Sequence, residues 1–330
     1  MKTLIKAFKW FGIALALLLI GFVLFVFMRA ERTYEAPYPE IVASSDSLVI
    51  ARGRDLFYGP AHCSGCHAPA DQLERLEAGE EVLPSGGEDF DLPIGIIHSP
   101  NITPDVDTGI GSFTDGELAR ALRYGVKRNG QALMDFMPFY DLSEEDLTAV
   151  ISFLRSVPPV YNVRPENEWN FLGNMVRALG MIKPMGDAEV PPTPPADSTA
   201  DYGHYIAESI ANCRGCHTKR DMMTGGWIGP DYAGQAVFEI EDGSGDEKYI
   251  VTPNLTPDQG TGRMVNWTQE AFITRFRTGM TIDESVMPWG QFSRMTDMEL
   301  AALYKFFQSL EPVIAEDPIP VGVQTLALGE

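Results

Sequence analysis

The four cysteines of the 330-residue chain form two pairs with the same spacing, and a histidine follows each pair at once. The groups are Cys63, Cys66 and His67, and Cys213, Cys216 and His217. Two thiols with this spacing can reach both vinyl groups of one porphyrin, and the adjoining imidazole can bind the iron from the same side. The pattern predicts that the chain covalently attaches two haem c groups.

Three other uses of paired cysteines fit less well. A thioredoxin-like redox pair would need one C-x-x-C motif in a βαβ setting and would give the histidine no role. A structural zinc site would keep its pairs much closer than Cys66 and Cys213 are. Two disulfides of this spacing would close small strained rings that stabilise little. Haem attachment is favoured because it uses every cysteine and both histidines.

A haem iron that only carries electrons needs a second axial ligand, and methionine is a common one. The chain has 14 methionines, and most methionines fill gaps in cores. Met137 and Met287 are distinguished by position, because each lies at the same distance after its histidine and directly before a proline. We predict that they ligate the two irons, whereas Met134, Met280 and Met295 lack counterparts and are predicted to pack in the core.

Other polar residues offer weaker signals. The histidines His62, His98 and His204 have no histidine counterparts in the other half and are predicted to be surface or loop residues. Haem propionates require donors or cations. The candidates are Asn101, Thr103, Asn254, Thr256, Arg120, Arg123, Arg275 and Arg277. Ordinary turns and solvated helix faces explain each of these equally well.

The motifs belong to an internal duplication. A shift of 150 residues superimposes Gly53 on Gly203, each cysteine motif on the other, and Met137-Pro138 on Met287-Pro288. With three further residues of shift, the run NITPD after residue 100 matches NLTPD after residue 253. A repeat on this scale predicts two similar domains.

Helical patterns surround each motif in the same order. Helices are predicted at residues 47–61, 114–124, 202–212 and 268–277, and closing helices begin at Ser143 and Thr296, which are good N-caps. Apolar residues then recur at i, i+3, i+4 and i+7. They are Leu147, Val150, Ile151, Leu154, Leu300, Leu303, Tyr304 and Phe307. These stripes are predicted to face the cores.

The first 32 residues read as a membrane anchor. Residues 11–28 carry no charge and include thirteen Leu, Ile, Phe or Val residues, whose insertion is favourable by about 4–8 kcal/mol. A cleaved signal would have a shorter apolar core and a small-residue cleavage site. The cations before this segment predict that the N-terminus is cytoplasmic; they are Lys2, Lys6 and Lys9. The anchor would then cross a bacterial inner membrane, and the rest of the chain would lie in the periplasm.

We therefore expect an all-α chain with an anchor at residues 1–32 and class I cytochrome c domains at residues 33–160 and 201–330. Residues 161–200 would form a linker, with an apolar segment at 171–182 and a proline-rich spacer. The apolar segment could pack across both domains or lie on the membrane. Packing is favoured because its polar face has few cations.

The formal charge of −21 limits the partners. Phosphate would be repelled by so many carboxylates, so no nucleic-acid partner is expected. A basic protein would be attracted instead.

Several sequence runs resemble the cytochrome c subunits of bacterial membrane-bound alcohol, aldehyde and gluconate dehydrogenases. They are SPNITPD at 99–105, TGIGSFTD at 108–115, RALRYGV at 120–126 and Met137-Pro-Phe. The resemblance implies electron transfer from a dehydrogenase subunit to quinone or another carrier. Those subunits commonly have three haem motifs, whereas this chain has two. Two-haem membrane cytochromes that serve terminal oxidases are an equally fair comparison.

The expected function is electron transfer between a dehydrogenase or quinol-oxidising complex and a respiratory acceptor, without bond chemistry on the chain. One alternative is a dihaem peroxidase-like enzyme, which would need an open iron coordination position. Another is a subunit that mainly assembles a larger respiratory complex.

Overall fold

The computed structural model describes residues 2–185, 190, 192–221, 226–240, 248–282, 285–315 and 323–325. The helices are α1 (Lys2–Ala30), α2 (Ser47–Tyr58), α3 (Cys63–His67), α4 (Leu73–Glu77), α5 (Asp115–Tyr124), α6 (Glu144–Ser156), α7 (Phe171–Leu179), α8 (Ala200–Tyr205), α9 (Cys213–His217), α10 (Gln269–Arg277), α11 (Trp289–Phe292) and α12 (Asp297–Ser309). A 3₁₀ turn spans Ala70–Gln72, and a π-helix at Ile206–Ile210 continues α8. The described chain is mostly helical, as expected.

The predicted helix starts are confirmed by their caps. Thr114 and Thr296 form capping boxes with Glu117 and Glu299, in which each side chain bonds the backbone N–H of the other residue. Ser143 accepts from the N–H of Asp146 at the start of α6. These caps satisfy N–H groups that the first helical turn leaves without partners.

The same helix pair frames each cysteine motif. Helix α2 packs on α6, and α8 packs on α12. A Cβ atom at Gly53 would lie 1.9 Å from the carbonyl oxygen of Ala149, and one at Gly203 would lie 2.1 Å from that of Ala302. Both crossings therefore require glycine, which explains why these residues recur in the duplication.

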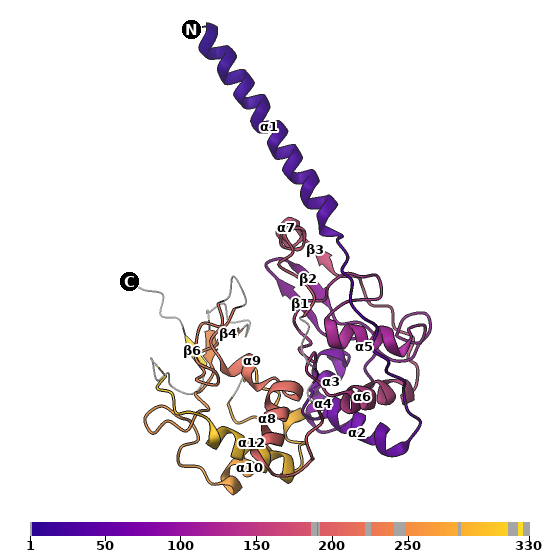
Figure 1. Ribbon diagram of the computed structural model, residues 1–330, viewed down its shortest axis with the longest axis vertical. Helices are drawn as coiled ribbons and strands as arrows, with labels where there is room; N and C mark the ends of the chain where they lie inside the picture. Colours follow the sequence, from indigo (N-terminus) through magenta and orange to yellow (C-terminus); the bar gives the residue numbers. More distant parts are fainter. Residues whose placement is uncertain are drawn as a thin grey trace.

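The apolar stripes of the closing helices are buried as predicted, apart from Tyr304, which is half-buried. Leu147, Ile151 and Leu300 are fully inaccessible to solvent. One continuous apolar core runs through both halves of the molecule and joins α2 and α6 to α8 and α12. The halves are thus packed against each other (Figure 1).

Two small antiparallel sheets correct the all-α expectation. The strands are β1 (Asp89–Leu92), β2 (Gly95–His98), β3 (Glu168–Trp169), β4 (Val237–Ile240), β5 (Lys248–Val251) and β6 (Val323–Thr325), in the orders β1-β2-β3 and β4-β5-β6. In register, Asp89 pairs with His98 and Val237 with Val251. The strands are too short for alternation to reveal them among Gly- and Pro-rich loops.

The first sheet reaches into the predicted linker. Glu168 of β3 pairs with Ile96 of β2, so this segment belongs structurally to the first half. In the other half, β6 pairs with β5 in the corresponding position after the closing helix. Part of residues 161–200 is therefore a sheet strand and not a spacer.

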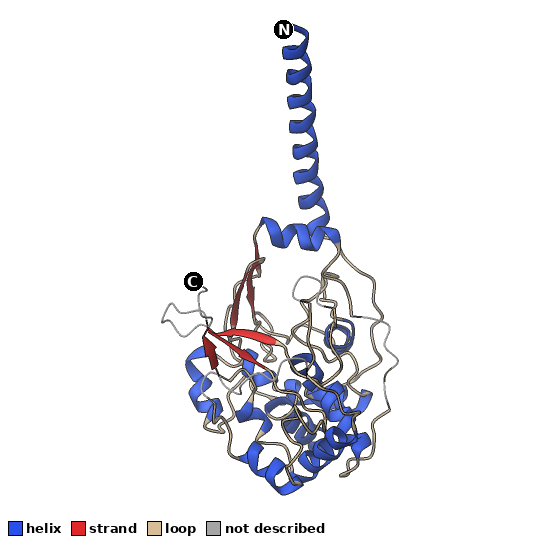
Figure 2. Ribbon diagram, turned by 90° about the vertical axis from the view of Figure 1, so that its left-hand side faces the viewer, coloured by secondary structure: helices blue, strands red, loops and turns tan. Residues whose placement is uncertain are grey.

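Helix α1 projects from the body, and its far end contacts no other part of the described chain (Figures 1 and 2). Residues 3–30 are long and apolar enough to cross a membrane, and only 6% of the most apolar window is buried. The C-terminal part of α1 packs on α7, where Val26 and Ala30 are buried. Length and composition alone would also fit a signal sequence.

Candidate haem-binding sites

Each cysteine motif forms a single helical turn that begins from an unusual backbone conformation. His62, before α3, has φ 41°, and Asn212, before α9, has φ 49°. Non-glycine residues rarely adopt this left-handed region, although His and Asn tolerate it better than most. The same turn thus occurs at both motifs and sets the direction in which the cysteine side chains leave the helix.

The two motif histidines make the same partly buried hydrogen bond. The Nδ1–H of His67 donates to the carbonyl oxygen of Pro100 at 3.1 Å, and that of His217 donates to Pro253 at 3.0 Å. Because a carbonyl oxygen can only accept, Nδ1 must carry the proton and Nε2 keeps its lone pair. Burial lowers the pKa of both imidazoles. Each histidine is therefore oriented as a neutral Nε2 metal ligand.

An asparagine holds the proline carbonyl in place at each site. Asn101 Nδ2 donates to the carbonyl of Val160 at 2.8 Å and to Thr108 Oγ1 at 3.1 Å. Its Oδ1 accepts from both the N–H and the hydroxyl of Thr103. Asn254, with Thr256, Thr261 and Val313, makes the same set of bonds in the second half.

This network decides how the repeated asparagines act. Both amide hydrogens of Asn101 and of Asn254 are used within the protein. The predicted role as propionate donors is therefore not supported for these residues. They instead fasten the loop whose carbonyl orients the neighbouring histidine.

The cysteines have the environment of protonated, unpaired thiols. All four are free of disulfides. Burial raises the pKa of Cys63 to about 12 and also raises the pKa of Cys66, Cys213 and Cys216. A thioredoxin-like pair would instead require a lowered thiol pKa. The raised pKa values of the thiols therefore disfavour a thioredoxin-like pair.

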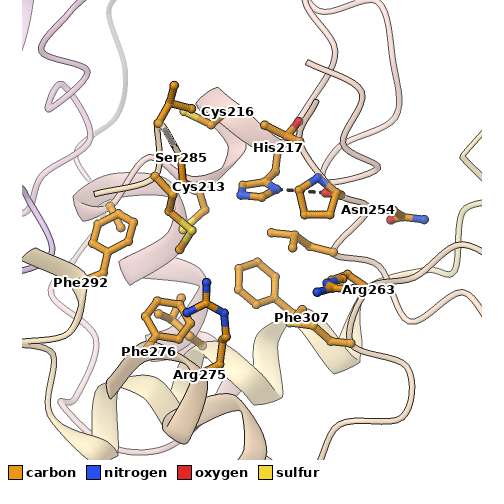
Figure 3. Close-up of a pocket in the computed structure, with 18 of the residues that line it drawn as sticks. Cys213, Cys216, His217, Asn254, Arg263, Arg275, Phe276, Ser285, Phe292 and Phe307 are labelled. Carbon is orange, nitrogen blue, oxygen red and sulfur yellow. Dashed lines mark hydrogen bonds between the residues drawn. The ribbon is translucent and has the colours of Figure 1, made fainter. Parts of the chain in front are cut away.

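The second cysteine motif opens into a cavity of about 410 Å³ (Figure 3). We call it the second cavity because it adjoins the second motif. Cys213, Cys216 and His217 line it from α9, and Met287 lines it from the loop before α11. Aromatic side chains that include Phe276, Trp289 and Phe307 form much of the remaining wall. A predominantly apolar cavity of this size is typical of a cofactor site. The predicted thiols, imidazole and thioether thus meet in one space.

The two predicted methionine ligands occupy equivalent turns. The N–H of Phe139 donates to the carbonyl of Met137 at 2.9 Å, and the N–H of Trp289 donates to Met287 at 2.8 Å. Both methionines are half-buried beside the core. The sequence interpretation did not identify Met264, which lines the second cavity together with Met287 and Met295.

The burial of these methionines separates their roles. Met264 and Met295 are almost fully buried as core side chains. The carbonyl of Met295 accepts from Arg277, which fixes its backbone. Met287 is the cavity methionine that lies in the repeated turn before a proline, so the assignment of Met137 and Met287 stays a prediction that the local geometry favours.

Three of the four candidate arginines are occupied by protein groups. Arg120, Arg123 and Arg277 each donate to backbone carbonyls of neighbouring loops. Arg123 and Arg277 are structural equivalents, since each fastens the loop ahead of its closing helix. These three residues thus serve the fold.

Arg275 is the exception, and it faces the second cavity (Figure 3). Its Nη1 donates to the carbonyl of Gly279 at 2.6 Å, and its guanidinium lies 3.6 Å from the centre of the Trp289 ring. Its Nη2 is buried without a hydrogen-bond partner among the described residues. Burial lowers the pKa of Arg275, and Arg263 lowers it further. A cation at an apolar cavity, with one donor free among the described residues, fits an anionic group such as a haem propionate.

The remaining histidines differ from one another. His98 bonds Asp89 through Nδ1 at 2.7 Å, and the His204 ring packs on Phe306. Neither lines the cavity. His204 is exposed, as predicted, whereas the prediction is wrong for His98, which lies in β2 with a side chain only 7% exposed. His62 does line it, and its ring lies edge-on to Phe292 with 5.7 Å between centroids. The residue before Cys63 therefore contributes to the other half's site.

Sequence reasoning missed two features of the sites. It did not find the histidine-orienting carbonyls, although Pro100 and Pro253 occupy equivalent positions before Asn101 and Asn254 and could have been noticed. It predicted only that His62 is a surface or loop residue and did not connect it with the other half's site. Only the packing of the two halves brings this residue to the second cavity.

Residues 50–158 match the family model described as Cytochrome c. This stretch of the chain is therefore similar to a cytochrome c domain, and the match supports haem c binding and electron transfer. The match includes Cys63, Cys66, His67 and Met137.

Curated relatives narrow the comparison. The chain is 30% identical over 251 residues to the cytochrome c subunit of alcohol dehydrogenase (quinone) from Gluconacetobacter polyoxogenes. The aligned region covers 69% of this chain and 51% of the relative. It is 30% identical over 185 residues to the gluconate 2-dehydrogenase cytochrome c subunit from Pantoea cypripedii, covering 54% and 40%. A diheme cytochrome c-type from Cereibacter sphaeroides is 27% identical over 230 residues, covering 63% and 74%.

These relatives confirm the resemblance to dehydrogenase cytochrome c subunits and to dihaem cytochromes. The chain spans about half or less of the dehydrogenase subunits that it matches.

Proposed function

We propose that this chain binds two haem c groups and carries electrons at the periplasmic face of a bacterial inner membrane. In this proposal Cys63 and Cys66 attach one haem, and Cys213 and Cys216 attach the other. The axial ligands are His67 with Met137 and His217 with Met287. The two sites would belong to consecutive class I cytochrome c domains, and no bond chemistry would occur on the chain.

One observation carries the proposal. The imidazoles of His67 and His217 both present Nε2 because their Nδ1 protons are bound to the carbonyls of Pro100 and Pro253. A surface or core histidine would not need the same orienting device at two places 150 residues apart. Metal-bound histidines usually have such a partner on the second ring nitrogen.

The position of His62 supports transfer between the sites. This residue adjoins Cys63 in the first half and lines the cavity that holds Cys213. The two proposed haems would therefore lie close enough to share a wall of protein. Haem iron supplies the one-electron chemistry, and the protein supplies ligands, burial and charge.

The donor and acceptor are proposed from the relatives. Two of these relatives are subunits of dehydrogenases, so we propose a dehydrogenase or quinol-oxidising complex as donor and a respiratory carrier or terminal oxidase as acceptor. Lys2, Lys6 and Lys9 at the start of α1 support a cytoplasmic N-terminus.

The test is to produce the full chain in a host that attaches haem c and to measure its intact mass and spectra. The mass is expected to increase by two haems, and both irons are expected to be low-spin. Met137→Ala and Met287→Ala should each convert one iron to a high-spin or readily ligand-binding form. Met295→Leu is the matched control, because Met295 lines the same cavity but is predicted to be a packing residue.

Several results would contradict the proposal. A bare-chain mass would exclude haem attachment. Low-spin iron at both sites in the Met287→Ala protein would exclude that ligand. High-spin iron in the unmodified protein would favour a peroxidase-like enzyme. Protease treatment of spheroplasts tests the topology, because a periplasmic body should be digested while the cells remain intact.

A further inference from the structure

Helix α7 is an apolar surface helix at the base of α1. Phe171, Leu172, Leu179 and, just beyond the helix, Met181 are 42–56% exposed. Large apolar side chains at this density on one short segment form a surface that water disfavours. The opposite face is occupied, because Gly173, Arg177 and Ala178 are buried.

The buried face of α7 is fixed to the first sheet and to the exit of α1. A Cβ atom at Gly173 would lie 2.1 Å from the carbonyl oxygen of Ile94, which leaves no freedom to rotate the helix. Arg177 pairs with Glu31 at 3.2 Å and lies over the Trp169 ring at 4.9 Å. The exposed apolar face is thus held in one direction.

The height of α7 along α1 is set by an aromatic contact. The rings of Phe171 and Phe22 are 6.5 Å apart, edge to face. Phe22 lies six residues before Met28, the end of the uncharged stretch. At 1.5 Å per residue, the contact is about 9 Å inside that end. Amphipathic helices that lie in a membrane surface are buried by about 5–10 Å.

The orientation also agrees with a membrane surface. Figure 1 shows α7 almost end-on and Figure 2 shows it lengthwise across the foot of α1. If α1 spans the bilayer, α7 therefore lies close to the bilayer plane. The helix cannot avoid lipid in this arrangement, because α1 carries it there.

Neighbouring residues supply the polar groups that a membrane surface attracts. Arg29 and Lys183 are exposed beside α7, where anionic headgroups would lie. Tyr34, whose hydroxyl donates to the carbonyl of Ile182 at 2.9 Å, and Trp169 place aromatic rings at the same level. Such rings are enriched at membrane interfaces. Arg177 on α7 is paired with Glu31, so Arg29 and Lys183 supply the cations that headgroups would meet.

We infer that α7 is embedded in the outer interface of the bilayer and that it holds the haem-binding body at a fixed orientation to the membrane. This inference rests on the proposed membrane span of α1. It corrects the expectation that residues 171–182 pack across both halves, since α7 contacts α1 and the first sheet.

The test uses spin labels on single cysteines in the full chain, reconstituted in nanodiscs of zwitterionic and anionic phospholipid. Leu172→Cys probes α7, Leu18→Cys probes the middle of α1, and Leu48→Cys is an exposed control on α2, far from α1 (Figure 1). Collisions with oxygen, which enters lipid, are compared with collisions with a water-soluble nickel complex. The oxygen-to-nickel ratio is expected to be several-fold higher at Leu172 and Leu18 than at Leu48.

The outcomes separate this inference from the proposals on which it rests. A high ratio at Leu18 with an aqueous ratio at Leu172 would overturn the placement of α7 and leave the span intact. Aqueous ratios at both would overturn both. Labelling of the unmodified chain would show that its own cysteines are not bound to haem, which is a separate failure.

A second measurement needs no substitution. Photoactivatable phospholipids should form adducts with residues 171–182 of the unmodified chain and not with α2. Adducts confined to α1 would overturn the inference, including the case in which a protein partner covers α7 instead.

Discussion

Arg52 of α2 donates from Nη1 to Glu299 of α12 at 3.2 Å, and this bond joins the two halves of the molecule. The same guanidinium makes a two-pronged pair with Asp146, at 2.9 and 3.0 Å. Asp146 and Glu299 are equivalent positions near the starts of α6 and α12. One cation therefore neutralises the corresponding buried carboxylate of each half.

Loss of Arg52 should be strongly destabilising. The side chains of Asp146 and Glu299 are only 5% and 8% exposed, so Arg52→Gln leaves two carboxylates buried without their cation. The expected loss of folding free energy is about 3–5 kcal/mol. Denaturant unfolding of the haem-loaded protein measures it. Arg54→Gln, which removes an exposed pair with Glu81 on the same helix, should cost at most about 1 kcal/mol. Equal losses in the two variants would contradict this account.

Alanine should not be tolerated at the two helix crossings. In Gly53→Ala or Gly203→Ala the new methyl group meets a backbone carbonyl oxygen, so helices must separate. We expect about 1–3 kcal/mol of destabilisation, even though alanine favours helix by about 1 kcal/mol. Thermal unfolding is the measurement. Gly116→Ala is the control, because its Cβ would lie 3.4 Å from the nearest atom, the carbonyl oxygen of Pro39. A similar loss there would refute the steric explanation.

Arg275 should raise the reduction potential of the second haem. A positive charge at the cavity favours the reduced iron, so Arg275→Gln should lower that potential, by about 60 mV if the charge contributes a factor of ten. Arg275→Lys keeps the charge and should retain most of the potential. Redox titration of both haems provides the comparison. An unchanged potential in the Gln variant, or a shift confined to the first haem, would show that Arg275 does not act on this site.

His62 should make stability depend on pH. Burial lowers the pKa of this imidazole below its usual 6.5, although its bond to the Pro60 carbonyl opposes the shift. The unfolded chain therefore binds a proton that the folded chain refuses. Neutral His62 therefore leaves the free energy of unfolding unchanged above about pH 6.5, and this free energy decreases as the pH falls below that value.

The matched variant is His62→Asn, which copies Asn212 and accepts the same left-handed backbone. Its melting temperature should fall less than that of the unmodified protein between about pH 7.5 and 5.5. An equal or larger fall would mean that other groups cause the acid sensitivity.

Local chemistry in the sequence determined a large part of this protein. The spacing from Cys63 to His67 and its copy from Cys213 predicted the haem chemistry, because the two thiols and the imidazole of an attachment motif are close neighbours in the sequence. Ser143 and Thr296 revealed helix starts because a cap bonds its own first turn. The uncharged residues 11–28 identified α1 by length and composition alone.

Tertiary structure decided what depends on residues far apart in the chain. His62 reaches the second cavity only because the halves pack together. The fold also places Arg275 at this cavity, with a buried Nη2 that has no hydrogen-bond partner among the described residues. The strands were missed because their pairing, such as Ile96 with Glu168, joins segments that carry no local signal. The exposed face of α7 likewise follows from its contact with Phe22, since a helix can bury either side until a neighbour fixes its rotation.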